Sequence, residues 1–238
     1  MTTAEHSEPL MPGGGISKRP LHFIIAADCS GSMTGEKIQA LNYAVADMLP
    51  HLADWERTQE QARVLVRAVS FGEEVRWHVA EPTPVTSLRW PPLRAKGPTP
   101  MGAALASIAE VLAPGRLERR ALRPALLLIT DGRPTDKDDG FERGLSALLA
   151  TPAGRSALRL ALAIGDDAVH EPLTRFIDDP SVPVLVADSA EEIADRLVAA
   201  SIAVSRMSEI GVDRDAIARR VLAGESVGST VTDADTIV

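Results

Sequence analysis

Two acidic and three hydroxyl candidate ligands fall in three short segments that adjoin expected strands and helices. The segments are Asp28-Cys29-Ser30-Gly31-Ser32, Gly97-Pro98-Thr99-Pro100-Met101-Gly102 and Thr130-Asp131-Gly132. Carboxylate and hydroxyl oxygens suit a hard divalent cation such as Mg²⁺, which takes octahedral oxygen ligands and keeps several waters. If the directly bonded groups are mainly neutral hydroxyls, the ion stays electrophilic and attracts one more anionic ligand. The sequence therefore predicts a binding site and no catalytic residue, with these candidate metal ligands: Asp28, Ser30, Ser32, Thr99 and Asp131.

Alternating strands and helices must position these segments. Apolar runs typical of strands lie at 22–27, 62–71, 124–130, 157–164 and 182–186, and a partner strand at 74–79 follows a tight turn. Helical patterns lie at 36–52, 101–112, 141–149, 171–177 and 190–205, and a proline-rich loop is expected at 80–100. This order predicts an α/β fold with a doubly wound, mostly parallel six-stranded sheet, one antiparallel edge strand and helices on both faces. Ligands of such sheets sit beyond the carboxyl ends of the strands, where the three segments fall.

The chain divides by composition into three parts. Residues 1–19 are polar and rich in Gly and Pro, which predicts a disordered arm. Residues 20–206 carry the alternating pattern and are expected to form one domain. Residues 207–238 are expected to hold a short helix at 213–222 and then a mobile acidic tail.

The three segments, in this order, resemble the metal-ion-dependent adhesion site (MIDAS) of von Willebrand factor A domains. That site has the pattern D-x-S-x-S, a downstream Thr and T-D-G, and the resemblance covers roughly residues 20–206. The chain is more closely similar to the bacterial TerY-like branch, which is associated with tellurium-resistance operons. The similar stretches are LHFIIAADCSGSMTGEKIQALNYAV, SFGEEV, GPTPMGAAL and LLLITDGRPTD.

The resemblance implies a role for each candidate ligand. Ser30 and Ser32 would bond the metal through their hydroxyls, and Thr99 would bind directly or through water depending on state. Asp28 and Asp131 would act mainly through water, or directly in a closed state. Pro98 and Pro100 would stiffen the loop around Thr99.

The resemblance also implies a function. The chain would be a non-enzymatic, metal-dependent protein-protein interaction module that uses Mg²⁺, or alternatively Mn²⁺ or Ca²⁺. A partner protein would supply an Asp or Glu carboxylate to the metal. The TerY-like branch implies an adaptor in a bacterial stress-response or phospho-signalling complex, with a protein kinase and a PP2C-type phosphatase as candidate partners.

Charge and cysteine content exclude several other classes. The chain has 25 basic and 33 acidic residues, a net charge of −8, which argues against nucleic acid and anionic membranes as partners. A single cysteine excludes a disulfide framework and a CxxC zinc site, and fits a reducing compartment. The first twenty residues contain no signal-peptide stretch, and no apolar run approaches the length of a membrane helix. We therefore expect a cytoplasmic protein.

Two other functions remain open from the sequence. A phosphohydrolase of haloacid-dehalogenase type would use Asp28, Thr130 and the Gly165-Asp166-Asp167 loop. Ser30 argues against it, because that family places an Asp there as the general acid and a hydroxyl cannot donate that proton at neutral pH. The other alternative is an adaptor subunit of an ATP-driven chelatase or remodelling machine, whose ATPase would be a separate protein.

Several other residues have side chains capable of chemistry but are not candidate metal ligands. Cys29 is expected to be buried and inert. Asp136, Asp138 and Asp139 are expected to start the helix after Asp131, and Asp136 could shape the rim of the site. Tail residues are candidates for phosphorylation or for a carboxylate that reaches the metal: Ser229, Thr230, Thr232, Asp233, Asp235 and Thr236. The scattered histidines are expected on the surface or at helix ends: His6, His22, His51, His78 and His170.

Overall fold

The computed structural model describes residues 18–165, 168 and 170–206. The acidic tail, its expected helix at 213–222, and Asp166 and Asp167 lie outside the described residues, as does all but the end of the N-terminal arm. Within the described part, no helix combines the length and apolar composition needed to cross a membrane.

Six strands form one sheet in the order β3-β2-β1-β4-β5-β6. All neighbouring pairs are parallel except β2 and β3, so β3 is an antiparallel edge strand. This arrangement confirms the predicted α/β fold and its sheet. The strand bounds are β1 (Arg19–Asp28), β2 (Ala62–Phe71), β3 (Val75–Pro84), β4 (Ala125–Thr130), β5 (Leu158–Ile164) and β6 (Leu185–Ala187).

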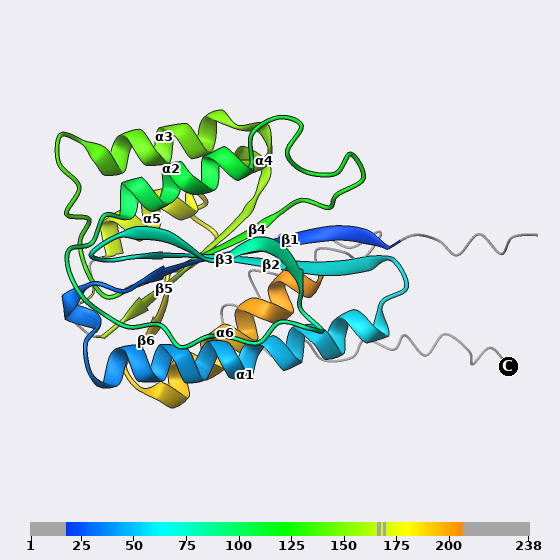
Figure 1. The fold of residues 1–238 in the computed structure, drawn as a ribbon, viewed down its shortest axis with the longest axis horizontal. Helices are drawn as coiled ribbons and strands as arrows, with labels where there is room; N and C mark the ends of the chain where they lie inside the picture. Colours follow the sequence, from blue (N-terminus) through cyan, green and yellow to red (C-terminus); the bar gives the residue numbers. More distant parts are fainter. Residues whose placement is uncertain (1–17, 166–167, 169, 207–238) are drawn as a thin grey trace, which may run out of the picture.

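Helices cover both faces of the sheet. Helices α1 and α6 pack together on one face, and α2, α3 and α5 lie on the other (Figure 1). The helix bounds are η1 (Gly31–Met33), α1 (Glu36–Thr58), α2 (Met101–Val111), α3 (Gly140–Ala150), α4 (Pro152–Ser156), α5 (His170–Ile177) and α6 (Ala190–Arg206). Strands β4 and β5 are buried along their whole length, as expected for parallel strands covered on both faces.

Four elements differ from their predicted extents by more than one residue. Strand β1, expected at 22–27, runs from Arg19 to Asp28. Strand β3 continues to Pro84, into the predicted loop, because an edge strand accommodates proline and Thr83 still pairs with Val66. Helix α1 continues six residues beyond Leu52 because it gains a contact that the sequence does not reveal: the buried Glu56 carboxylate accepts the N–H of Val64. Strand β6 shrinks to three residues, and the short α4 was not predicted.

Helices α2 and α3 touch through their backbones. A Cβ atom built on Gly144 would lie 2.0 Å from the carbonyl oxygen of Gly102, and one on Gly102 would lie 2.2 Å from that of Gly140. Only glycine fits such an approach. Because Gly102 lies in the first turn of α2, this contact fixes the end of the helix that follows Thr99.

Candidate metal site

The ends of two adjacent strands hold the deepest part of the site. Asp28 ends β1 and Thr130 ends β4, and these strands are parallel neighbours. The Thr130 hydroxyl donates to Oδ2 of Asp28 over 2.5 Å, and the N–H of Ser30 donates to Oδ1 over 2.7 Å. Asp28 is completely buried, so these two bonds hold its carboxylate in a fixed orientation.

A chain of hydroxyls joins the two candidate carboxylate segments. The Oγ atoms of Ser30 and Ser32 are 3.0 Å apart, and Ser32 Oγ donates to Oδ1 of Asp131 over 2.7 Å. The structure therefore brings together four of the five candidate ligands. They come from segments about one hundred residues apart, and they are close in space because β1 and β4 are neighbours in the sheet.

Thr99 is placed by its backbone rather than by its side chain. Its N–H donates to the Thr135 hydroxyl over 2.7 Å, and its carbonyl accepts the N–H of Thr135 over 2.9 Å. Gly31 N–H donates to the carbonyl of Gly97, which ties this loop to the first segment. In the described part of the chain, the Thr99 hydroxyl has no hydrogen-bond partner and does not bond to the other four candidates. That leaves the hydroxyl free to bind something else.

The electrostatics of the site favour a cation. Burial raises the pKa of the Asp28 carboxyl, the bonds from Thr130 and Ser30 oppose that rise, and the nearby Asp131 adds to it. Two close, buried carboxylates are costly without positive charge. The described residues contain no cluster of three or more His, Cys, Asp or Glu able to hold a metal. The available donors are therefore two carboxylates and neutral hydroxyls, which fits a hard divalent ion bound partly through water.

Lys37 is a member of this cluster that the sequence did not reveal. It lies in the first turn of α1, and its Nζ donates to Oδ2 of Asp131 over 2.7 Å. The Asp131 side chain is 1% exposed and that of Lys37 is 33% exposed. Their separation of 94 residues gives no local signal, since the contact depends on the first turn of α1 meeting the end of β4.

The prediction for Asp136 was wrong about which helix it serves. Its carboxylate accepts the N–H groups of Gly102 and Ala103 at 2.9 and 3.1 Å, so it caps α2 rather than starting α3. Asp139 immediately precedes α3, has a left-handed backbone and forms no side-chain cap. Asp136 thus fastens the helix that begins just after Thr99 to the segment that follows Asp131.

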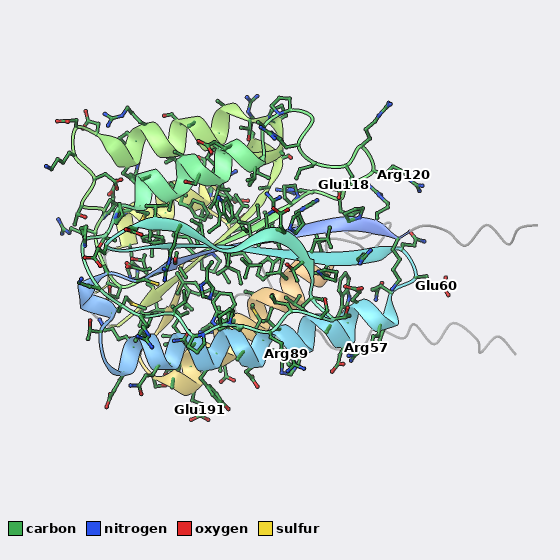
Figure 2. The ribbon with its side chains drawn as sticks, viewed as in Figure 1. Arg57, Glu60, Arg89, Glu118, Arg120 and Glu191 are labelled. Atoms are coloured by element: carbon green, nitrogen blue, oxygen red, sulfur yellow. The ribbon has the colours of Figure 1, made fainter. Side chains whose placement is uncertain are left out.

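His22 was wrongly predicted to be a surface residue. It is 3% exposed, and its Nε2 lies 2.7 Å from Oε2 of Glu118. Glu118 lies in the segment between α2 and β4 (Figure 2). His22 is buried because β1 is a central strand covered on both faces. Its ring nitrogen therefore bonds to a residue that is distant in the sequence. His51 and His170 are exposed as predicted, and His6 lies outside the described residues.

Cys29 is buried, as predicted, with 6% of its surface exposed. Burial and the neighbouring Asp28 charge raise the pKa of its thiol to about 12. Because the thiolate is the reactive form, Cys29 should react with iodoacetamide at pH 8 on the order of 10³-fold more slowly in the folded protein than in the denatured one. Cys29 is the only cysteine, so mass spectrometry of the intact chain measures this directly. Equal rates in native buffer and in guanidinium chloride would contradict the prediction.

Comparison with known proteins identifies the fold. No protein-family model matches the chain, and no curated protein matches it. The von Willebrand factor type A protein from Catenulispora acidiphila superposes with a TM-score of 0.59 at 19% identity, over 79% of this chain and 43% of that one. Manganese-loaded Plasmodium vivax TRAP superposes with a TM-score of 0.51 at 21% identity, over 76% of this chain and 74% of that one. Mussel byssus proximal thread matrix protein 1, with a zinc-occupied MIDAS motif, superposes with a TM-score of 0.57 at 16% identity. The match covers 79% of this chain and 48% of that one.

These likenesses define the class of structure. The chain has the fold of von Willebrand factor type A domains, as the sequence resemblance implied. It spans less than half the length of the Catenulispora and mussel chains, so the activities of those whole proteins remain proposals for this one.

Proposed function

We propose that this chain is a metal-dependent protein-interaction module whose domain spans residues 20–206. The observation that carries the proposal is the hydrogen-bonded cluster of Asp28, Ser30, Ser32 and Asp131 at the carboxyl edge of the sheet. A bound divalent ion would supply a Lewis-acidic position for a carboxylate oxygen of a partner protein. The donor set favours Mg²⁺, with Mn²⁺ or Ca²⁺ as alternatives.

Each residue has a distinct part in this proposal. The hydroxyls of Ser30 and Ser32 would bond the ion directly, and that of Thr99 would bind directly or through water depending on state. Both oxygens of Asp28 already accept hydrogen bonds, so its carboxylate would hold the ion mainly through water and balance its charge. Asp131 would do the same, since its oxygens accept from Ser32 and Lys37. The manganese-loaded and zinc-occupied neighbours support a divalent ion in this fold.

The finer assignment rests on the sequence alone. We propose a cytoplasmic, TerY-like adaptor in a bacterial stress-response complex, with a protein kinase and a PP2C-type phosphatase among its candidate partners. The motif stretches that resemble the TerY-like branch support this, together with the low cysteine content. An adaptor subunit of an ATP-driven machine would use the same metal site toward a different partner.

The geometry of Asp28 disfavours the phosphohydrolase alternative. A nucleophilic carboxylate must reach the phosphorus atom of its substrate, yet Asp28 is 0% exposed. Its two oxygens are also held by Thr130 and Ser30. This carboxylate is therefore suited to supporting other groups rather than to attacking a substrate.

Removing the two serine hydroxyls tests the proposal. The double variant Ser30→Ala/Ser32→Ala should lose affinity for Mg²⁺ and Mn²⁺ at least about tenfold, because it deletes two direct ligands without changing the charge. Calorimetric titration of protein stripped with EDTA measures this, and thermal unfolding with and without metal gives a second readout. The matched control is Ser107→Ala/Ser156→Ala, which removes one half-buried and one exposed hydroxyl that bond only to nearby backbone carbonyls. Wild-type affinity in the double site variant would overturn the assignment of these serines as ligands.

A further inference from the structure

A lysine ammonium is built into the proposed metal site. Helix α1 begins after Gly35, whose φ of 88° is positive, and Lys37 in its first turn contacts Asp131 just after the end of β4. Lys37 Nζ donates to Oδ2 of Asp131 and Ser32 Oγ donates to Oδ1, so each oxygen of this buried carboxylate has its own donor. Within residues 18–165, 168 and 170–206, Lys37 is the only basic side chain that forms an ion pair with a candidate ligand.

The ammonium changes the charge that the site offers to an ion. Asp28 and Asp131 together contribute −2 when ionised, and Lys37 brings the sum to −1. With a divalent ion bound, the site then carries +1, and one carboxylate from a partner makes it neutral. Without Lys37 the ion-loaded site would already be neutral, and a partner's carboxylate would make it negative.

We propose that Lys37 couples metal binding to partner binding: it weakens the site for the bare ion and preserves positive charge for an incoming carboxylate. This inference rests on the proposed function and specifies how the site is regulated. The Asp131 carboxylate is almost completely buried, so the ammonium acts on it with little screening by water. The partner group that fits is a single, monoanionic carboxylate, as on an Asp or Glu side chain.

The position of Lys37 distinguishes this role from a general surface-charge effect. Lys96 provides the comparison, because it lies in the loop between β3 and α2 and its N–H donates to the carbonyl of Cys29, next to Asp28. Its ammonium pairs with Glu73 over 2.7 Å, and its side chain is 74% exposed. Removing the charge of Lys96 therefore changes the net charge of the protein equally but leaves the carboxylate cluster intact.

The test measures Mn²⁺ binding to EDTA-stripped full-length protein by electron paramagnetic resonance of the free ion. Lys37→Met should bind Mn²⁺ about tenfold more tightly than the wild type, because it removes one unit of repulsion close to the ion. Lys37→Gln should act in the same direction, and Lys37→Arg and Lys96→Met should bind as the wild type does. Thermal unfolding in EDTA adds a readout without metal: Lys37→Met should lower the melting temperature because Asp131 loses its ion pair, and Mn²⁺ should more than restore it.

A second titration adds N-acetyl-glutamyl amide as the carboxylate probe. The probe should raise the Mn²⁺ affinity of the wild type and of Lys96→Met, and raise that of Lys37→Met less. Equal or weaker Mn²⁺ binding by both Lys37→Met and Lys37→Gln, with wild-type binding intact, would overturn the role of Lys37 and leave the metal site standing. Absence of Mn²⁺ binding in every protein, the wild type included, would overturn the proposed function and this inference together.

Discussion

Replacing Gly144 with alanine is expected to lower the free energy of unfolding by about 3 kcal/mol or more, because the new methyl group meets backbone. Its Cβ would lie 2.0 Å from the carbonyl oxygen of Gly102. Alanine is favoured over glycine inside a helix by only about 1 kcal/mol, so the clash outweighs the gain in helix propensity. Chemical denaturation followed by circular dichroism measures the change. Since α2 must move away from α3, the loop holding Thr99 should shift with it.

The matched control for this change is Gly132→Ala. A Cβ there has Ser32 Oγ as its nearest neighbour, at 3.8 Å, which is an ordinary contact. Its stability should stay within about 1 kcal/mol of the wild type. Equal stability of the Gly144 and Gly132 variants would show that the two helices can separate without cost, contrary to the packing described above.

Replacing Asp131 with asparagine is expected to reduce Mn²⁺ affinity about a hundredfold, because one of the two negative charges next to the ion disappears. The shape of the side chain is kept, so its packing against Ser32 should survive. The amide cannot form an ion pair with the Lys37 ammonium, which leaves that ammonium uncompensated at the site and adds to the loss. Calorimetry of stripped protein measures the affinity.

Asp136→Asn is the control for Asp131→Asn. It removes the same charge five residues away, but from a carboxylate that caps α2 through Gly102 and Ala103. It should reduce stability by about 1 kcal/mol through the weakened cap and change Mn²⁺ affinity only a few-fold. A similar loss of affinity in both variants would mean that the ion responds to the general field of the protein rather than to Asp131.

The fold was predictable because its signals are local. Apolar runs such as those of β4 and β5 show directly that both faces are covered. Four candidate ligands were predictable because each lies at the end of a strand or within four residues after it, and parallel strands bring those ends to one edge. Their role as metal ligands stays a prediction.

What could not be predicted depends on long-range contacts. Lys37 meets Asp131 across 94 residues, and Asp136 meets Gly102 across 34. The buried ring of His22 bonds to Glu118, 96 residues away. In each case a polar side chain bonds to a segment that is distant in the sequence. Neither periodicity nor residue spacing within one segment predicts such a contact.

The two hydrogen bonds between Thr99 and Thr135 have a consequence for the thermodynamics of ligand binding. The Thr99 loop is held at Gly97 by Gly31, at Thr99 by Thr135, and at the start of α2 by Asp136. Two flanking prolines restrict its backbone further. A loop held by these hydrogen bonds has little conformational entropy left to lose. Binding of a ligand to the Thr99 hydroxyl would therefore require almost no ordering of the chain. The heat and entropy of binding at this edge should then report chiefly on the release of water.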